Sequence, residues 1–472
     1  MHAIGIDIGT TSICGVLLDV SDGKILKQQT IASEAFITTE NSWEKIQDVN
    51  KILSIARKIL DELLSPEVLA IGLTGQMHGI LYTDKEGVAI SPLYTWQDER
   101  GNQPYKETTY AAYLGSYTGY GNVTDFYNRI NGLRPKEAAS YCTIQDYLGM
   151  VLCGLKKPVI HKSNAASFGC FEPKTCEFRD AVNVERIGVM STCLGGDERK
   201  SFGPDGEITG DYRIIGKYQN IPVSVAIGDN QASVFSTMAD ENGILVNVGT
   251  GSQITVVSDD VIEGAGLESR PYVEGKYLVV GAALCGGRAY SILKDFYAKI
   301  LNAAGTDMLY EGAGMRHGTE DGTRSGTEAG ALDIYGLMEK LMEEDSALPG
   351  LKVDTRFAGT REEPTIRGSI TGISEENFTP GALAKGVLAG MAEELYHMYC
   401  RMNVSRGGLI GSGNGIRKNR RLMEVMENYF GEKMKIPAHK EEAAYGAALF
   451  ALVACGKFRN AADARKLICY KD

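Results

Sequence analysis

The chain repeats one local plan at two places about half its length apart. Residues 4–19 and 244–259 each contain an apolar stretch, a turn with Gly, Thr and Ser, and a second stretch rich in β-branched residues. Such stretches favour strands, and glycines in the turn favour a tight hairpin whose backbone can approach a ligand closely. The offset of 240 residues is far longer than a solenoid repeat. The sequence therefore predicts two similar halves with a cleft between them.

The length and the apolar periodicity agree with two mixed domains. A single hydrophobic core usually stops growing near about 250 to 300 residues, and this chain has 472. Residues 43–64 space their apolar side chains at helical intervals, and residues 68–73 form a short apolar run typical of a buried strand. We predict an α/β fold with a hinge at the polar and acidic residues 237–243. The first domain would cover residues 1–236 and the second residues 237–472.

The second half carries further helical patterns. We expect helices over residues 384–399, 420–430 and 441–454, and a short strand and turn over residues 407–411. Residues 305–364 are richer in glycine and charge, so we expect loops and an appended element there.

Composition and charge exclude several classes of protein. The 60 acidic residues outnumber the 49 basic ones, and the net charge of −11 has the wrong sign for binding a nucleic-acid backbone. No apolar run approaches the roughly 20 residues of a membrane span. The N-terminal residues lack the basic and apolar regions of a secretory signal, which predicts a cytoplasmic protein. The ten cysteines show no CxxC spacing, which favours reduced thiols over a zinc ribbon or a disulfide framework.

Each of the two hairpin turns carries groups that bind phosphate. Asp7 ends the first apolar stretch and is a candidate for holding Mg²⁺ directly or through water. The turns offer backbone N–H groups and hydroxyls to phosphate oxygens. For one copy alone a plain hairpin turn is an even alternative, but two copies at half-chain spacing favour phosphate binding. The candidate nucleotide-binding residues are Gly9, Thr10, Thr11, Ser12, Gly249, Thr250, Gly251 and Ser252.

These turns differ from the two familiar phosphate loops. The sequence lacks the GxxxxGK[ST] spacing of a P-loop, and its glycines connect strand to strand instead of strand to helix as in a Rossmann site. A third glycine-rich turn opens a helix near Arg420, where a backbone without side chains could approach adenine or ribose. A helix-capping turn is an equal alternative. Its residues are Gly411, Ser412, Gly413 and Asn414.

Asp229 follows a predicted strand over residues 223–227 and opens a helix. In α/β folds, ligands commonly collect at the carboxyl ends of strands, beside the N–H groups of helices. Asp229 is therefore a candidate catalytic carboxylate, with Asn230 beside it. The alternative is a capping role, for which aspartate is well suited.

Two further segments combine polar donors and acceptors with an aromatic ring. Residues 76–79 and 96–100 each follow an apolar run, and a pocket that recognises a polyol needs this mixture. Individually, His78 could be a core histidine and Arg100 a surface ion-pair partner. The candidate substrate-binding residues here are Gln76, Met77, His78, Trp96, Asp98 and Arg100.

Taken together, these motifs resemble the FGGY family of carbohydrate kinases. The resemblance covers essentially the whole chain, and the motifs occur in the order and spacing of the family. They lie at residues 7–12, 75–79, 96–100, 228–232, 249–252 and 411–413. Within the family the chain is most similar to sedoheptulokinases and next to xylulokinases. Residues 95–98, 144–148, 152–155 and 164–169 carry this finer resemblance.

The resemblance implies two ribonuclease-H-like domains of the actin type, which close over ATP with Mg²⁺ and over a ketose or polyol. It implies that Asp229 is the general base and that Asp7 serves the metal. It places Thr11, Thr250 and Ser252 near phosphates. By the same resemblance, the sugar pocket would be lined by Gln76, Met77, His78, Trp96, Asp98 and Asn230.

The chain departs from the family pattern at named positions. Gln145 stands where many members have lysine, so any contact of that lysine is not carried over. Ser412 separates the glycines of the third turn. Residues 249–252 keep the general form of the second hairpin, whereas vertebrate sedoheptulokinases have a serine-richer version.

The function that we predict is an ATP-dependent kinase acting on the terminal primary hydroxyl of a ketose, with sedoheptulose to sedoheptulose 7-phosphate as the first choice. Xylulose, or another ketose or polyol, is the alternative within this class. An actin-like or chaperone-like ATPase is an alternative of a different class, but it needs neither Asp229 nor the polar pocket. A sugar-responsive repressor would need a basic helix-turn-helix, and only six residues precede Asp7. The expected partners are a sugar and ATP, without nucleic acid or membrane, and a homodimer is compatible with the sequence.

Overall fold

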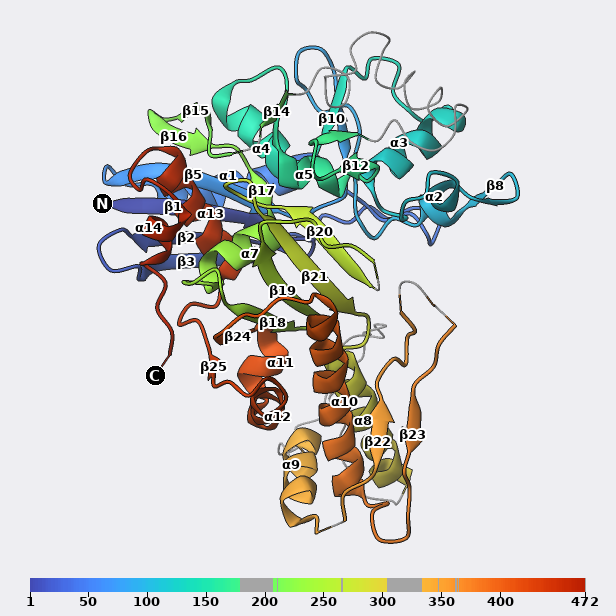
Figure 1. The fold of residues 1–472 in the computed structure, drawn as a ribbon. Coiled ribbons are helices and arrows are strands. Elements are labelled where there is room, and N and C mark those ends of the chain that lie inside the picture. Colours follow the sequence, from blue (N-terminus) through green and yellow to red (C-terminus); the bar gives the residue numbers. More distant parts are fainter. Residues whose placement is uncertain are drawn as a thin grey trace, which may run out of the picture.

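Two β-sheets organise the chain, one in each half (Figure 1). The structure is a computed structural model, and it describes residues 1–178, 207–209, 211–264, 266–303, 333–346, 348–360, 363 and 365–471. Residues 304–332 of the expected appended element, and most of residues 179–210, lie outside the described part.

The first sheet has the strand order β15-β16-β5-β1-β2-β3, with β17 beside β5. Its central strands are nearly continuous apolar runs, which fits burial on both faces. The strands are β1 (His2–Ile8), β2 (Ser12–Asp19), β3 (Ile25–Ala32), β5 (Val68–Gly75), β15 (Ile214–Tyr218), β16 (Ile221–Ser224) and β17 (Ile227–Gly228).

The second sheet has the order β20-β21-β19-β18-β24-β25. Its strands are β18 (Ile244–Val248), β19 (Ser252–Ser258), β20 (Leu267–Pro271), β21 (Tyr277–Ala283), β24 (Leu409–Ser412) and β25 (Met434–Lys435). In both sheets, an antiparallel hairpin is followed by a third antiparallel strand and flanked by a parallel strand. The predicted hairpins are therefore confirmed, and the repetition extends from the turns to whole sheets.

The helix predicted over residues 43–64 is α1 (Val49–Leu63). It begins later than predicted because Asp48 caps it, accepting hydrogen bonds from Asn50 N at 2.8 Å and Lys51 N at 3.1 Å. The two residues before the cap instead form β4 (Ile46–Gln47), which pairs with β7 (Leu93–Tyr94). The strand predicted over residues 68–73 is confirmed and extends to Gly75 as β5.

Two helices, α7 (Asp229–Thr237) and α13 (Glu442–Ala454), cross each other beside the first sheet (Figure 1). A Cβ atom added to Gly5 or Gly72 would lie 1.8 Å or 1.9 Å from a carbonyl oxygen of α13. A Cβ on Gly446 would lie 1.8 Å from Ala232 O of α7. Glycine is required at these close approaches because any side chain would collide with backbone. A helix near the end of the chain therefore covers the sheet formed by its beginning.

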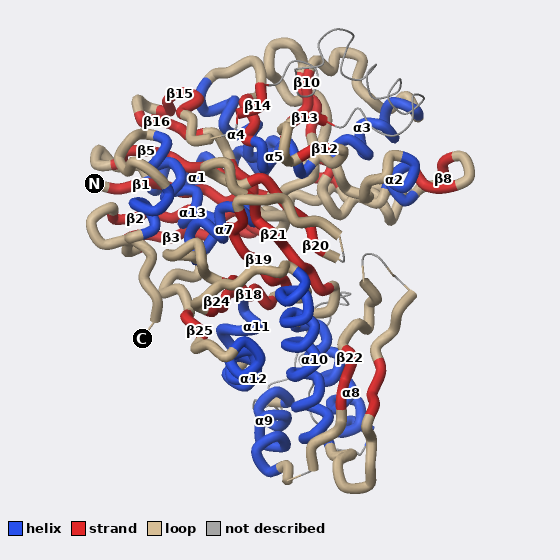
Figure 2. Tube along the Cα trace, in the orientation of Figure 1, coloured by secondary structure: helices blue, strands red, loops and turns tan. Residues whose placement is uncertain are grey.

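The helices of the second half gather beside the second sheet (Figure 2). The longest, α10 (Pro380–Arg401), contains the predicted helix 384–399 and begins after Thr379, whose side chain accepts a hydrogen bond from Ala382 N. The others are α8 (Gly287–Ala303), α9 (Ile334–Glu344), α11 (Gly413–Lys418) and α12 (Arg420–Phe430). The short helix α14 (Ala461–Arg465) instead packs with α7 and α13, next to the first sheet. None of the helices in the described ranges is long and apolar enough to cross a membrane.

The remaining elements belong to the first half, outside its main sheet, apart from one small hairpin in the second half. The helices are η1 (Arg100–Asn102), α2 (Tyr110–Tyr113), α3 (Gly121–Ile130), α4 (Ile144–Cys153) and α5 (Lys162–Ser167). The strands are β6 (Leu81–Thr83), β8 (Pro104–Tyr105), β9 (Thr108–Thr109), β10 (Ser140–Cys142), β11 (Val159–His161), β12 (Phe171–Glu172), β13 (Glu177–Phe178), β14 (Glu207–Thr209), β22 (Lys352–Asp354) and β23 (Ser369–Thr371).

Candidate active site

Asp229 is the first residue of α7 and follows the short strand β17. The capping position of this helix belongs to Gly228, which has no side chain to offer. Gly228 N donates a hydrogen bond of 3.0 Å to Ser163 Oγ of α5, which fixes the turn. Asp229 Oδ1 accepts a hydrogen bond of 2.6 Å from Asn230 N. One carboxylate oxygen is thus used to hold the side chain in place.

The carboxyl group of Asp7 lies within reach of the charges of Asp229 and Glu441. Burial, followed by the charges of Asp229 and Glu441, raises the pKa of Asp7 to about 7. Burial raises the pKa of Asp229 to about 6, against the backbone hydrogen bond from Asn230 and the positive charge of Arg270. A carboxyl group that titrates near neutral pH is matched to proton transfer at neutral pH. The structure thereby brings together the predicted metal residue and the predicted base.

The turn of the first hairpin is held by buried amides. Gln47 is fully buried, and its Nε2 donates a hydrogen bond of 2.7 Å to Thr10 O. Gln76 Nε2 donates to Gln47 Oε1 at 3.0 Å, and Thr10 Oγ1 donates to Gln76 Oε1 at 3.4 Å. Gln47 therefore links the predicted phosphate turn to a predicted sugar residue. Gln47 lies just before the cap of α1 and outside every motif in the sequence. The sequence alone therefore does not indicate that it belongs to the site.

His78 has a backbone φ of 73°, which is uncommon outside glycine and often marks a functional site. Ser167 holds the residue, because Ser167 Oγ accepts from His78 N at 3.1 Å and Ser167 O lies 2.8 Å from His78 Nδ1. A carbonyl oxygen only accepts, so Nδ1 carries the proton and the neutral ring has an acceptor at Nε2. The ring stacks on Tyr120 with the centroids 4.2 Å apart. The sequence analysis did not identify Tyr120.

Trp96 contacts the first hairpin, and Met77 lies beside the turn before Asp229. Trp96 is 47% exposed, and its Nε1 donates a hydrogen bond of 2.9 Å to Thr10 Oγ1. Met77 is buried beside the turn before Asp229, because a Cβ on Gly228 would lie 2.6 Å from Met77 Sδ. An exposed aromatic face and a buried thioether therefore frame the start of α7 and the first hairpin.

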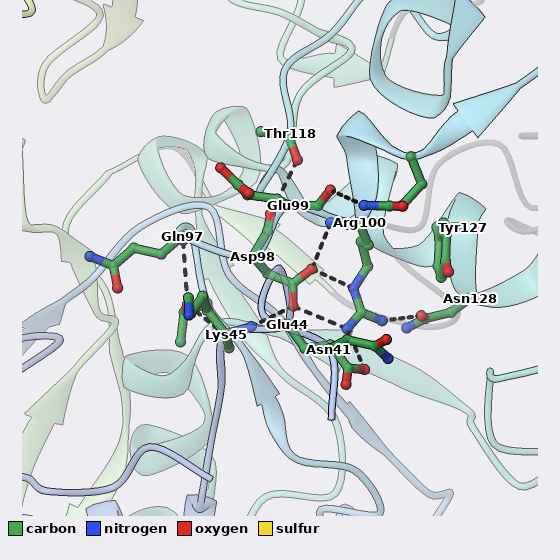
Figure 3. Close-up of polar contacts among 12 residues, drawn as sticks. Asn41, Glu44, Lys45, Gln97, Asp98, Glu99, Arg100, Thr118, Tyr127 and Asn128 are labelled. Carbon is green, nitrogen blue, oxygen red and sulfur yellow. Dashed lines mark hydrogen bonds and ion pairs between the residues drawn. The ribbon is translucent and has the colours of Figure 1, made fainter. Parts of the chain in front are cut away.

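Asp98 and Arg100 bind each other inside the fold (Figure 3). Arg100 Nε donates to Asp98 Oδ1 at 2.6 Å, and Arg100 Nη2 donates to Oδ2 at 3.1 Å. The same two oxygens accept from Arg100 N at 3.1 Å and from Lys45 N at 3.0 Å. The sequence analysis placed both residues among the sugar contacts, but their polar atoms are occupied by each other and by neighbouring backbone. The spacing of two residues in this loop produces an internal bidentate ion pair.

Arg100 has further partners that fix the loop carrying Trp96. Its Nη1 donates to Asn128 Oδ1, and its Nη2 lies 3.5 Å from Glu44 Oε1. The guanidinium lies over the ring of Tyr94, with Cζ 4.2 Å from the centroid. A buried charge with this many partners keeps the neighbouring residues in one arrangement. The Asp98–Arg100 pair therefore fixes the loop that carries Trp96.

The second hairpin and the third glycine turn lie side by side. Asn247 of β18 pairs with Ser412 of β24, and Asn247 Nδ2 donates to Ser412 Oγ at 2.8 Å. Gly413 has a φ of 81°, and a Cβ there would lie 2.5 Å from Val248 O. Only glycine fits where the turn crosses the end of β18. The structure therefore brings together the candidate nucleotide residues 249–252 and 411–414.

The first residues of α8 and α13 also belong to the side of the site that carries the predicted nucleotide residues. At α8, Gly287 N donates to Gly249 O and Arg288 N donates to Thr250 O, each at 3.0 Å. At α13, the half-buried Glu442 accepts a hydrogen bond of 2.9 Å from Arg417 Nη2, next to Glu441. The sequence analysis did not identify these contacts, because each joins segments far apart in the chain.

Two amides connect the start of α7 to the second sheet. Asn230 Nδ2 donates to Gln253 Oε1 at 3.3 Å, and Gln231 Nε2 donates to Pro271 O at 3.1 Å. Within the described residues, Asn230 Oδ1 is buried without a hydrogen-bond partner. A buried acceptor without a partner is costly, so this oxygen suits a hydroxyl donor of a ligand.

Gln145 is buried on α4, behind the end of β5. Its Nε2 donates to Gly75 O at 3.3 Å and to Asn164 Oδ1 at 3.2 Å. Asn164 Nδ2 in turn donates to Asp146 Oδ1 at 3.0 Å. Position 145 therefore carries a neutral amide and not a lysine charge.

Asp7 and Asp229 suit a Mg²⁺ ion that is shared with phosphate. Across the described ranges, no group of three or more His, Cys, Asp or Glu side chains could hold a metal ion by itself. Mg²⁺ commonly binds through one or two carboxylates together with water and phosphate oxygens, and not in an all-protein cage. Two neighbouring carboxylates beside the predicted phosphate turns fit this mode of binding.

Comparisons with known proteins agree with this arrangement. The model of the FGGY family of carbohydrate kinases, N-terminal domain, matches residues 2–236, and that of the C-terminal domain matches residues 244–455. The chain is 26% identical to sedoheptulokinase of Mus musculus, over 95% of this chain and 97% of that protein. It is 22% identical to xylulose kinase of Staphylococcus epidermidis, over 97% of this chain and 88% of that protein.

The structure of xylulose kinase from Rhodospirillum rubrum aligns with a TM-score of 0.79 at 18% identity, covering 100% of this chain and 93% of that one. The predicted α/β fold with two actin-like domains is thereby confirmed.

Proposed function

The chain belongs to the FGGY family of carbohydrate kinases, and from that premise we propose that it transfers the γ-phosphoryl group of ATP to the terminal primary hydroxyl of a ketose. Sedoheptulose, converted to sedoheptulose 7-phosphate, is the first choice of substrate. The observation that carries the proposal is the position of Asp229 beside Asp7, with a pKa of about 6.

In the proposed reaction, Asp229 accepts the proton of the hydroxyl that attacks phosphorus. Asn230 N holds one oxygen of the carboxylate, which leaves the other oxygen for the substrate. A pKa near 6 keeps the group ionised at neutral pH while leaving it basic enough to take a proton. Positioning of the hydroxyl by such a base is the main contribution that a kinase side chain makes to phosphoryl transfer.

The two hairpins would hold the phosphates from opposite sides. Thr10 and Thr11 belong to the first turn, and Thr250 and Ser252 to the second. Bound Mg²⁺, held by Asp7, would neutralise the developing charge on the phosphate oxygens. The third glycine turn lies against the second hairpin, so Gly413 would let the nucleotide approach the backbone closely.

The sugar would occupy the space framed by Trp96, His78 and Asn230. Asn230 Oδ1 is a buried acceptor that suits a sugar hydroxyl, and the imidazole of His78 is a second polar group of this space. The exposed ring of Trp96 offers an apolar face to the carbon chain. Asp98 and Arg100 would act on the sugar indirectly by holding Trp96.

The experiment that tests the proposal is a screen of ketoses and polyols with three to seven carbons in a coupled ADP-release assay. We expect the highest kcat/KM with sedoheptulose, and loss of turnover in Asp229→Asn with every acceptor. Highest activity with xylulose or glycerol would overturn the substrate. ADP release that needs no acceptor, and that persists in Asp229→Asn, would overturn the kinase assignment of this site.

We also propose that the protein works in the cytoplasm. The nine described cysteines are all free thiols, which suits a reducing compartment. Fractionation of the producing cells followed by activity measurement tests this assignment.

A further inference from the structure

Arg270 is a buried cation on β20, at the edge of the second sheet, and it belongs to none of the predicted motifs. Its side chain is largely buried, and Nη2 donates a hydrogen bond of 2.9 Å to Glu268 Oε2. Among the residues that the structure describes, Arg270 Nε is buried and has no hydrogen-bond partner. Buried N–H groups are nearly always paired, so this N–H suits an acceptor oxygen of a ligand.

The neighbours of Arg270 are the elements that carry the site. Pro271 O, one residue later, accepts the hydrogen bond from Gln231 on the first turn of α7. The strand also lies beside α5, whose Ser167 fixes His78 (Figure 1). The positive charge of Arg270 acts on the carboxylate of Asp229 and partly offsets the rise in its pKa that burial causes. Arg270 thus reaches the site from the second half, opposite residues of the first half.

The register of the second sheet places Arg270 away from the phosphate hairpin. Arg270 pairs with Leu278 of β21, and Leu278 pairs with Val257 of β19. Val257 is five residues along β19 from Ser252, which corresponds to roughly 16 Å at about 3.3 Å per residue. The backbone of Arg270 is therefore well separated from the phosphate hairpin along the strands.

We propose that Arg270 is a specificity-determining residue whose Nε–H donates to an oxygen of the sugar at the end remote from the phosphorylated hydroxyl. The inference rests on the proposed function of the site. A long ketose reaches from Asp229 to Arg270, whereas a three-carbon polyol ends before it. A site built to hydrogen-bond a substrate oxygen rejects a substrate that lacks it, because a buried polar group then stays unpaired. Arg270 thereby selects for chain length.

The test is Arg270→Lys, which keeps the positive charge but removes the Nε–H donor. We expect the ratio of kcat/KM for a seven-carbon ketose to that for glycerol to fall at least tenfold. The loss should lie mainly in KM for the ketose, with KM for ATP changed less than twofold. The control is Arg406→Lys, because Arg406 also has a buried Nε without a partner in the described residues, and its hydrogen bonds go to Val257, Ser405 and Tyr399. The control should leave the ratio unchanged.

Three outcomes would overturn the inference. The first is an unchanged ratio in Arg270→Lys, and the second is an equal loss with every acceptor together with a lower Tm, which would indicate a purely structural pair with Glu268. If neither Arg270→Lys nor Arg270→Gln folds, the wild-type enzyme is compared on the seven-carbon ketose and on its analogue deoxygenated at the remote end. Equal kcat/KM for the two is the third overturning outcome. Wild-type enzyme without activity on any ketose would instead refute the proposed function, so the two failures are distinguishable.

Discussion

Trp96 Nε1 donates a hydrogen bond of 2.9 Å to Thr10 Oγ1, so one hydroxyl joins the loop predicted to meet the sugar and the turn predicted to meet phosphate. The same hydroxyl donates to Gln76 Oε1. A change on the sugar side therefore reaches the phosphate side through the side chain of Thr10, in addition to the route through Gln47.

Trp96→Phe keeps an aromatic face but removes the donor to Thr10. We expect KM to rise about three- to tenfold for both sugar and ATP, because a net hydrogen bond contributes roughly 0.5 to 1.5 kcal/mol. Initial-rate kinetics with each substrate varied in turn measures both constants. The matched control is Trp43→Phe, which changes the second tryptophan, packed edge-on against Tyr127. A rise in the sugar KM alone would show that the Thr10 contact does not couple the two sides.

Asp229→Asn keeps the shape of the side chain and an oxygen for Asn230 N, but it cannot take up a proton. We expect kcat to fall by on the order of 10² to 10⁴, the usual contribution of a positioned base, with little change in sugar affinity. Turnover and calorimetric sugar binding measure the two effects separately. Asp240→Asn, at an exposed carboxylate of the predicted hinge, is the control and should stay near wild type. Turnover of Asp229→Asn within threefold of wild type would remove Asp229 from the mechanism.

Asp7→Asn should stabilise the protein in the absence of ligands at pH 8. The pKa of Asp7 is about 7 in the folded state against an ordinary value of 3.8, so the folded state binds the proton more tightly than the unfolded state. The contribution of this carboxyl group to stability is fully present below about pH 4 and is lost as the pH rises through about 7. We expect a gain on the order of 1 to 3 kcal/mol at pH 8, shrinking toward zero near pH 4.

Thermal unfolding of both proteins without divalent cations, at pH 4.5 and pH 8, measures this difference. The control is Asp22→Asn, because the hydrogen bonds from Lys24 lower the pKa of that exposed carboxyl group. The control should show no gain at pH 8. An Asp7→Asn variant that is less stable than wild type at pH 8 would contradict the raised pKa.

Asp98→Ala should mainly lower the free energy of unfolding. Removing one partner of a buried ion pair leaves the guanidinium of Arg100 uncompensated, which typically costs about 3 to 5 kcal/mol. Chemical denaturation measures the loss, and the sugar KM should rise only through displacement of Trp96. Glu99→Ala, at the exposed neighbour, should stay within about 0.5 kcal/mol of wild type. A fully stable Asp98→Ala variant with a raised sugar KM would restore Asp98 as a direct sugar contact.

The parts of the fold and site that follow from the sequence are those encoded locally. The two hairpins and the long helices each rest on patterns within a few residues, and the structure contains them all. The strand predicted over residues 223–227 is divided between β16, which ends at Ser224, and β17, which begins at Ile227. Asp229 itself was identifiable because it stands where a strand gives way to a helix. Its role as a base stays a prediction.

The parts of the site that the sequence does not predict depend on contacts between segments far apart in the chain. Arg270 reaches the site through the register of three strands, and Tyr120 through stacking on His78. Asp98 and Arg100 look like exposed polar residues in the sequence, yet they are buried because Lys45, Glu44 and Asn128 surround them. Composition and local spacing carry no information about such neighbours.

The packing of α13 on Gly5 and Gly72 also sets the order in which the newly made chain can fold. The ribosome releases β1 first, but one face of its sheet waits for a helix that begins at residue 442. At about 5 to 20 residues per second, the wait is roughly 20 to 90 seconds. During synthesis the first half therefore exposes an apolar surface that the end of the chain covers only when it has been made.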